Sequence, residues 1–220
     1  VAAGGAPGEA LAPPAAREGQ RSRAKRALLE AIAPLRRGFT ASAEQRSVVG
    51  GLVSALSALS PISDPTSRLG GNWTLIYTDA PDIIGIPAGP LSELGRIGQE
   101  IDAASGTIAN VIEYVPSGLA RSLPLGDRAS GDRLVQRVFT AYRASSPTSV
   151  ELDIRGLGFF LERVLGLDVP GFLSLKQEGP LSLPFGRFEV LYLDEDIRIV
   201  KTGQGWTSIN RRYDPALDRA

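Results

Sequence analysis

Carboxylates are densest in residues 192–199, YLDEDIRI, where Asp194, Glu195 and Asp196 follow one another. Three oxygen ligands in a row could serve a hard cation, but a calcium site needs about six donors and the spacing of a calcium-binding loop is absent. An Asp at the corner of a hairpin accepts hydrogen bonds from the backbone. We therefore expect Asp194 and Asp196 to hold a hairpin turn at the rim of a sheet, with Arg198 paired to one of them, and we expect no metal site.

The residue types that most often carry catalysis are missing. The chain has no His and no Cys, which removes the commonest general base, thiol nucleophiles, and zinc or iron–sulfur ligation by thiolates. It also lacks a G-x-S-x-G motif, a P-loop and a strand-linked G-x-G-x-x-G motif. The remaining acid–base candidates are Tyr77, Tyr192 or a buried Asp. We expect a protein that is not an enzyme and needs no cofactor.

Composition describes an ordinary globular chain. Its 220 residues include 24 Lys and Arg against 24 Asp and Glu, so the formal net charge is zero and nothing favours nucleic acid. No window reaches the roughly 18 apolar residues that a membrane-spanning helix needs. The sequence starts at Val1 and contains no Met. We therefore expect that upstream residues have been removed, for which an organelle transit peptide is one source.

Two predicted strands, residues 72–78 and 188–193, each place three bulky side chains at alternate positions. Because alternate residues of a strand point to the same face, each set forms an apolar stripe. Such stripes either line a chamber for an apolar ligand or fill a core, and the pattern allows both. Phe159 and Phe160 are further bulky candidates. The residues predicted to bind a ligand are Trp73, Leu75, Tyr77, Phe139, Phe188, Val190 and Tyr192.

The first sixty residues carry tail and helix signals. Residues 1–20 are rich in Ala, Gly and Pro without a hydrophobic period, which predicts a disordered tail. In residues 23–37 apolar side chains recur at helical spacing. Ser42 and Gln45 form a capping box that opens a second helix, ending before Pro61. We expect two helices within residues 23–60.

Near residue 70 the hydrophobic period changes from about 3.6 to about 2. The nine predicted strands are residues 72–78, 98–102, 107–115, 133–143, 149–155, 172–177, 188–193, 197–201 and 206–212, and residues 158–165 suggest a helical turn. Tight turns between strands indicate an antiparallel meander, which loses its edges by closing. We predict a mainly β fold: an antiparallel up-and-down barrel over residues 70–212. The two helices close one end or side of it, within one domain of residues 21–220.

Two motifs resemble those of a known family. Residues 69–78, LGGNWTLIYT, resemble the opening of the plastid-lipid-associated protein (PAP)/fibrillin family, and residues 188–199, FEVLYLDEDIRI, resemble its C-terminal signature. Together they bracket residues 23–212, nearly the whole chain. The chain departs from the family after Ile199, where Val200-Lys201-Thr202 replaces the usual run of small, basic and Gly residues.

The resemblance implies a lipocalin-like barrel in a plastid, associated with plastoglobules or thylakoids. Such a protein would bind carotenoids, prenylquinones or fatty acids without catalysis, and its partners would be an apolar lipid and a membrane or lipid-body surface. Gly71-x-Trp73 is similar to the lipocalin entry motif, in which a late basic residue packs across the Trp. Arg211 or Arg212 is expected in that place at the rim.

Two alternatives stay open beside lipid binding. In the first, the barrel is filled and the protein coats lipid bodies, with the helix at residues 23–37 lying on the lipid. The apolar face of that helix consists of Leu28, Leu29, Ile32 and Leu35. In the second, Tyr77, Tyr192 or a buried Asp acts on an apolar substrate inside the barrel.

Overall fold

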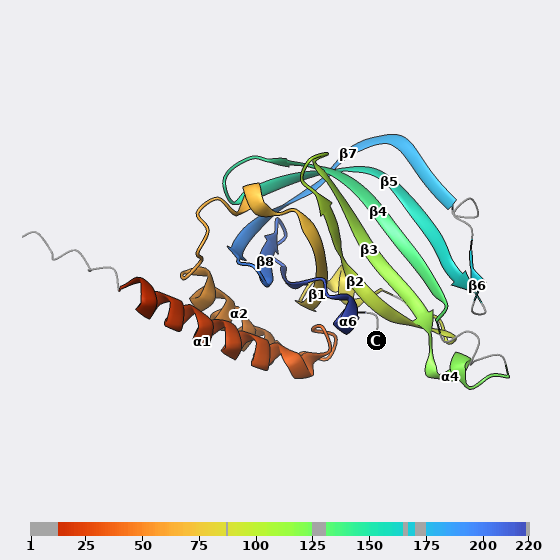
Figure 1. Ribbon diagram of the computed structural model, residues 1–220, viewed down its shortest axis with the longest axis horizontal. Helices are drawn as coiled ribbons and strands as arrows, with labels where there is room; N and C mark the ends of the chain where they lie inside the picture. Colours follow the sequence, from red (N-terminus) through yellow and green to blue (C-terminus); the bar gives the residue numbers. More distant parts are fainter. Residues whose placement is uncertain (1–12, 87, 125–130, 165–166, 170–174, 219–220) are drawn as a thin grey trace, which may run out of the picture.

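A single antiparallel sheet dominates the structure, a computed structural model that describes residues 13–86, 88–124, 131–164, 167–169 and 175–218 (Figure 1). Its strands are β1 (Gly71–Thr78), β2 (Ser92–Asp102), β3 (Thr107–Pro116), β4 (Arg133–Ala144), β5 (Ser149–Val164), β6 (Leu167–Asp168), β7 (Leu175–Leu193), β8 (Ile197–Thr202) and β9 (Thr207–Arg212). The predicted mainly β, antiparallel fold is confirmed.

Eight of these strands form a ring. They pair in the order β4-β3-β2-β1-β9-β8-β7-β5, and β4 also pairs with β5, so the two ends of the order meet. β6 pairs with the end of β5. Strands that follow one another in sequence are mostly neighbours in the ring, as predicted for an up-and-down meander.

The ring has a short wall and a long wall. β1, β8 and β9 have 8, 6 and 6 residues, whereas β2, β3, β4 and β5 have 11, 10, 12 and 16. In Figure 1 the long strands run on past the short ones, away from the N-terminal helices. The two ends of the ring are therefore enclosed to different extents.

Two helices precede the sheet. α1 (Pro14–Ile32) continues into a short 3-10 helix, η1 (Ala33–Leu35), and α2 (Ala43–Ser57) follows. The predicted capping box is confirmed: Ser42 Oγ accepts from the Gln45 amide at 3.1 Å, and Gln45 Oε1 accepts from the Ser42 amide at 2.9 Å. Residues 14–20, which the sequence assigned to the tail, belong to α1, and residues 1–12 lie outside the described residues.

α1 and α2 cover the outer face of the short wall. Their apolar residues pack against side chains of β1, β7, β8 and β9 in what we call the helix-side cluster. Its buried members are Leu28, Ile32, Leu35, Val49, Val53, Leu56, Tyr77, Tyr192, Ile197, Ile199 and Ile209.

A second group of buried residues, the inner cluster, fills one end of the ring. Apart from Leu69, which precedes β1, its members come from β1, β2, β3, β5, β7 and β8, so they can meet only inside the ring. They are Leu69, Trp73, Ile101, Ile108, Val150, Phe188, Val190, Leu193 and Val200. We call this the closed end and the opposite end the open end.

Two β-bulges decide which side chains face inward. The pairing of β1 with β9 shifts between Leu75 and Tyr77, and that of β7 with β8 shifts between Val190 and Tyr192. An extra residue in a strand sends the following side chain to the other face. Trp73 and Val190 accordingly lie in the inner cluster, whereas both tyrosines lie in the helix-side cluster. The prediction that each tyrosine continues its apolar stripe is therefore wrong.

Two other details differ from the predicted elements. β5 continues to Val164, so the predicted helical turn at residues 158–165 is wrong; the alternation of apolar residues there is that of a strand. The predicted strands 172–177 and 188–193 belong to one strand, β7, from Leu175 onward, while residues 172–174 lie outside the described part. The remaining short helices are η2 (Pro65–Arg68), α3 (Pro81–Ile84), α4 (Gly118–Arg121) and α6 (Pro215–Asp218).

Candidate functional site

A cleft of about 370 Å³ lies at the open end of the ring. Tyr114 is six residues from Ile108 of the inner cluster on β3, so both point to the inner face. Residues directly opposite in neighbouring strands share a face, which places Leu134 and Leu161 beside Tyr114. All three line the cleft, whose volume is within the range of about 300–1,000 Å³ found for small-molecule sites.

Bulky apolar side chains on the inner face of β5 stay accessible. Leu157, Phe159 and Leu161 alternate along the strand and are 40%, 36% and 39% exposed. Side chains of this kind are normally buried when they face the inside of a closed sheet. Here they face the part of the ring where the short wall has already ended. The arrangement leaves an apolar surface available to a ligand.

Uncharged polar groups interrupt this apolar face, and three charged residues, Asp132, Arg133 and Arg163, also line the cleft. Tyr114 Oη donates to Gln136 Oε1 at 3.3 Å within the cleft. Closer to the closed end, Gln99 Nε2 donates to Asn110 Oδ1 at 2.8 Å. Apolar walls with a small number of placed polar groups are typical of sites for small apolar molecules.

A buried cation lies next to this polar pair. Arg198 is fully buried, its guanidinium carbon lies 4.9 Å from the centroid of the Trp73 ring, and Nη2 donates to Gln99 Oε1. Burial, together with the nearby positive charge of Arg212, lowers the pKa of Arg198 to about 9. The guanidinium thus stands on the inner face, between the filled end and the open end.

Trp73 packs against Arg198 and belongs to the inner cluster at the closed end. Its indole Nε1 donates to the Leu69 carbonyl at 3.0 Å, and the guanidinium carbon of Arg212 lies 4.1 Å from its ring centroid. Arg212 Nη1 also donates to the Gly70 carbonyl at 2.9 Å. Of the two residues proposed to pack across the Trp, Arg212 does so, whereas Arg211 pairs with a carboxylate of α6 at 2.9 Å.

The residues predicted to bind a ligand are distributed over three places. Trp73, Phe188 and Val190 lie in the inner cluster, and Leu75 is buried opposite Asn210 of β9. Tyr77 and Tyr192 lie in the helix-side cluster.

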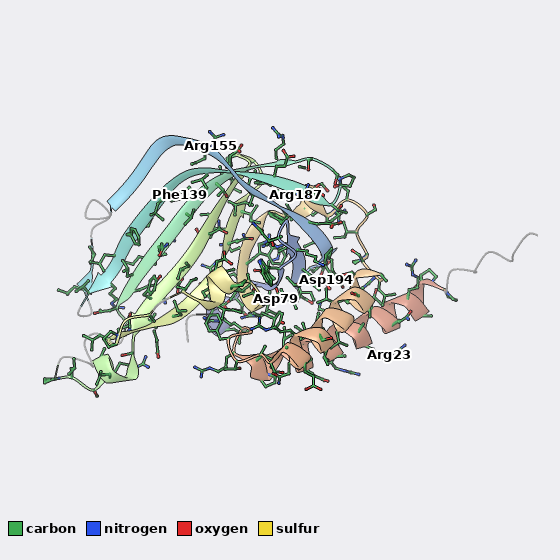
Figure 2. All side chains as sticks on the ribbon, turned by 180° about the vertical axis from the view of Figure 1, so that it is seen from behind. Arg23, Asp79, Phe139, Arg155, Arg187 and Asp194 are labelled. Carbon is green, nitrogen blue, oxygen red and sulfur yellow. The ribbon has the colours of Figure 1, made fainter. Side chains whose placement is uncertain are left out.

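Phe139, the seventh predicted residue, lies on the outer face of β4. It packs edge-to-face against Phe160 at a centroid distance of 6.3 Å. Figure 2 places Phe139 on the long strands and Asp194 beside the helices, far from one another. The structure brings none of the seven into the cleft, and their role in binding stays a prediction.

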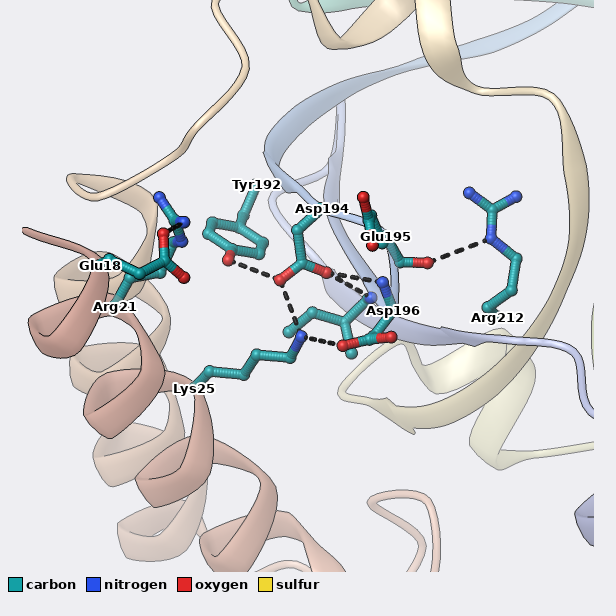
Figure 3. Close-up of polar contacts among 9 residues, drawn as sticks. Glu18, Arg21, Lys25, Tyr192, Asp194, Glu195, Asp196 and Arg212 are labelled. Atoms are coloured by element: carbon teal, nitrogen blue, oxygen red, sulfur yellow. Dashed lines mark hydrogen bonds and ion pairs between the residues drawn. The ribbon is translucent and has the colours of Figure 1, made fainter. Parts of the chain in front are cut away.

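The acidic hairpin joins β7, β8 and α1 (Figure 3). Asp194 Oδ1 accepts from the amides of Asp196 and Ile197, both at 2.8 Å, which is the turn role predicted for it. Its other oxygen accepts from Lys25 Nζ at 2.8 Å and from Tyr192 Oη at 2.7 Å. Lys25 also donates to Asp196 Oδ2 at 2.6 Å. The hairpin therefore ties the helices to the ring.

Hydrogen bonding controls the ionisation of this cluster. Burial by itself would raise the pKa of Asp194, but the hydrogen bonds from Lys25, Tyr192 and the turn amides outweigh it and lower the pKa. Burial and the bond to Asp194 raise the pKa of Tyr192. Arg198 does not join the cluster, contrary to prediction, because even-numbered residues of β8 face the inside of the ring.

A second cleft of about 710 Å³ lies between α1 and this hairpin. Its walls carry charges of both signs, and several of them already pair with one another, among them Lys25 with Asp194 and Arg21 with Glu18. These groups are engaged in holding the fold together. We therefore place the candidate functional site at the open end.

Sequence reasoning missed most of the cleft. Tyr114, Leu134, Gln136 and Leu161 were not proposed as ligand residues, and Phe159 was only noted as bulky. The available signal was the alternation of Leu157, Phe159 and Leu161, which predicts a strand when it is read with a period of two.

Comparison with known proteins connects this fold to one family. The sequence model of the PAP_fibrillin family matches residues 22–128. A probable plastid-lipid-associated protein 3, chloroplastic, of Oryza sativa subsp. japonica is 32% identical over 226 residues, which cover 89% of this chain and 60% of that protein. The chain thus spans about 60% of the length of this relative.

Two further relatives carry related names. Plastoglobulin-1, chloroplastic, of Pisum sativum is 35% identical over 92 residues, or 39% of this chain and 26% of that protein. A probable plastid-lipid-associated protein 5, chloroplastic, of Arabidopsis thaliana is 25% identical over 201 residues, or 89% of this chain and 72% of that protein. No solved structure matches the chain. Among the described helices, none combines the length and apolarity needed to cross a membrane.

Proposed function

This chain belongs to the PAP/fibrillin family, and from that premise we propose that it is a plastid protein of plastoglobules or thylakoids that holds an apolar lipid inside a lipocalin-like barrel. The names of two relatives describe lipid association in a plastid, and all three names place the relatives in the chloroplast. On this proposal the ring is the barrel, the open-end cleft is the entrance to its chamber, and binding involves no catalysis. Carotenoids, prenylquinones and fatty acids are the proposed ligands.

The observation that carries the proposal is the accessible apolar inner face of β5. Leu157, Phe159 and Leu161 leave apolar area in contact with water, although they face the inside of the ring. A lipid that covers this area removes it from water, which is worth about 25 cal/mol per Å². Covering roughly 200 Å² would then contribute about 5 kcal/mol before the entropy of association is subtracted.

The rim of the open end supports contact with a lipid surface. Four strongly exposed leucines surround the free ends of the long strands: Leu91 before β2, Leu119 on α4, Leu123 after it, and Leu167 on β6. Figure 1 shows α4 and β6 at the same end of the long wall. A water-insoluble ligand passes most easily between the chamber and a lipid phase if this rim meets the lipid.

The positions of the α1 apolar residues and of the two tyrosines favour lipid binding over the two alternatives. Coating through α1 needs the helix's apolar face, but Leu28, Ile32 and Leu35 are buried in the helix-side cluster. Catalysis by Tyr77 or Tyr192 needs those hydroxyls inside the ring, but both residues lie in the helix-side cluster, outside it.

Titration with diphenylhexatriene, an apolar dye that fluoresces when it leaves water, tests the proposal. We expect saturable binding to the purified protein, and Leu161→Asp should weaken it at least about tenfold because it places a charge on the apolar inner face, opposite Leu134. Leu217→Asp is the matched control, since Leu217 is an exposed leucine on α6, outside the cleft. Absence of saturable uptake by the folded wild-type protein would overturn the proposal.

Flotation with vesicles of phosphatidylcholine and phosphatidylglycerol tests the rim. Leu119→Asp should reduce the floating fraction, whereas Val48→Asp on α2 should leave it unchanged. The two residues are matched because each is 57% exposed. Equal losses in both variants would refute the open end as the contact surface. They would not contradict the proposed binding chamber.

A further inference from the structure

Within the part of the chain that the structure describes, the Arg198 side chain is a buried cation without a counter-ion. It is fully buried, and among the described residues nothing accepts a hydrogen bond from its Nε or Nη1. Its neighbours include the Trp73 ring, the Gln99 side chain and the second positive charge of Arg212. A buried charge is normally paired, because an unpaired one forfeits its hydration without compensation.

A structural role in closing the ring does not account for Arg198. Packing of a guanidinium across Trp73 is already performed by Arg212, which lies nearer the ring centroid, at 4.1 Å against 4.9 Å. Arg212 is also hydrogen-bonded through Nη1 to the Gly70 carbonyl and through Nε to the Glu195 carbonyl, at 2.9 and 3.3 Å. Among the described residues, Arg198 has a single hydrogen-bond partner, Gln99, and its Nε and Nη1 groups have none.

Arg198, Gln99 and Asn110 form a connected group that we call the polar floor. Arg198 Nη2 donates to Gln99, and Gln99 Nε2 donates to Asn110 at 2.8 Å. Because Asn110 accepts through its oxygen, its own amide Nδ2 remains to donate. The polar floor therefore offers N–H donors from an amide and a guanidinium and carries one net positive charge.

The polar floor lies on the inner face at the inward limit of the accessible apolar wall. Asn110 pairs with Val138 of β4, and Val138 pairs with Leu157 of β5. Leu157 is 40% exposed, and Gln99 and Asn110 are themselves only half-buried. From Leu157 the accessible side chains continue through Phe159 to Leu161 at the cleft. A chain-like molecule lying along this wall would end at the polar floor.

We propose that the polar floor binds the carboxylate of a long-chain lipid acid, whose hydrocarbon chain lies along the inner face of β5 toward the open end. The inference rests on the proposed function and specifies its ligand class. The carboxylate would replace Gln99 Oε1 as the acceptor for Arg198 and would also accept from Asn110 Nδ2. An anion fits better than a neutral head group, because it supplies the missing counter-charge as well as hydrogen-bond acceptors.

Displacement of bound diphenylhexatriene by hexadecanoate and by hexadecanol at neutral pH tests the proposal. The two competitors share one chain and differ in the charge of the head group. For the wild-type protein we expect hexadecanoate to compete at least about tenfold more strongly, a ratio that corresponds to about 1.4 kcal/mol. Arg198→Met should bring the ratio to about one, while Arg198→Lys should keep part of it because the charge remains.

Arg212→Met is the comparison variant: it removes the other guanidinium at Trp73, which is hydrogen-bonded to two backbone carbonyls, and should lower the ratio far less than Arg198→Met does. The thermal unfolding temperature without ligand distinguishes the carboxylate site from a merely structural role. If Arg198 only stabilised the fold, Arg198→Met would unfold at a lower temperature than wild type. Arg198→Met should unfold at the same or a higher temperature than wild type, because it removes an unpaired buried charge. A large drop in that temperature would overturn the assignment.

The outcomes separate this inference from the proposed function. If the dye binds and both competitors act equally on wild type, the carboxylate site is refuted while the lipid chamber stands. If the preference for hexadecanoate persists in Arg198→Met, the anchor is elsewhere and the inference is refuted. If the wild-type protein takes up neither dye nor competitor, both proposals are refuted.

Discussion

The closed and open ends of the ring treat large inner side chains in opposite ways. At the closed end Trp73 is fully buried, with the guanidinium groups of Arg198 and Arg212 against its ring. At the open end Phe159, on the same inner face, keeps 36% of its surface exposed. Both residues sit in strands with the same alternation, so alternation assigns a face but does not decide whether that face is filled.

The difference in burial between Trp73 and Phe159 follows from the strands that lie across the ring from each of them. Trp73 meets residues from strands all around the ring and is covered by Leu69 from the segment before β1. Phe159 belongs to a strand of 16 residues that faces a wall of strands with 6 to 8 residues. A long strand opposite a short one keeps its far end uncovered. The comparison teaches that the lengths of the strands, rather than their composition, divide this ring into a filled end and an open end.

The largest expected effect on the free energy of unfolding comes from replacing Trp73, which tests this division. Trp73→Ala should lower the free energy of unfolding by about 3–5 kcal/mol, because it leaves a cavity in a filled core. Phe159→Ala should lower it by less than about 1 kcal/mol, since the wild-type side chain is partly exposed. Urea denaturation measures both. Similar losses at the two sites would contradict the distinction between a filled end and an open end.

The next effect is on binding at the open end. Phe159→Ala should weaken diphenylhexatriene binding about tenfold, because roughly 1.4 kcal/mol of apolar contact is lost. Phe160→Ala is a closely matched control: the two residues are neighbours of the same type, but Phe160 lies on the outer face against Phe139. Fluorescence titration compares them. Equal weakening would show that the dye does not occupy the inner face.

A smaller effect separates the ion pairs at the two ends. Lys25 joins α1 to the hairpin at the closed end and is mostly buried, whereas Arg121 pairs with Glu93 at the open end at 2.9 Å with both side chains about half exposed. Lys25→Met should lower the free energy of unfolding by about 1–2 kcal/mol. Arg121→Met should change it by less than about 0.5 kcal/mol. The prediction fails if the exposed pair proves the more important one.

The smallest effect is a pH dependence at the closed end. Because the folded-state pKa of Asp194 lies below its ordinary value of 3.8, the ionised carboxylate stabilises the fold above that pH, and this contribution is lost as pH falls through the folded-state pKa. The difference in unfolding free energy between wild type and Asp194→Asn should be constant near neutral pH and shrink in acid. Urea denaturation at neutral and acidic pH checks this. A difference that grows in acid would reverse the assigned direction.

Local sequence determined the elements that depend on near neighbours. The capping box of Ser42 and Gln45, the hairpin turn at Asp194 and most strands of the meander follow from spacing of a few residues. The packing of Arg212 across Trp73 was one of two alternatives that the family resemblance implied. These features need only the chain within a few residues, or a motif already seen elsewhere.

Only the tertiary structure decided which side chains face the inside and whether they are covered there. The bulges before Tyr77 and Tyr192 come from strand pairing, and each turns a side chain from one face to the other. Arg198 follows a turn of carboxylates in the sequence, yet the pleat of β8 directs it into the ring. The open cleft arises because strands of unequal length meet across the ring, and local spacing carries no record of what stands opposite.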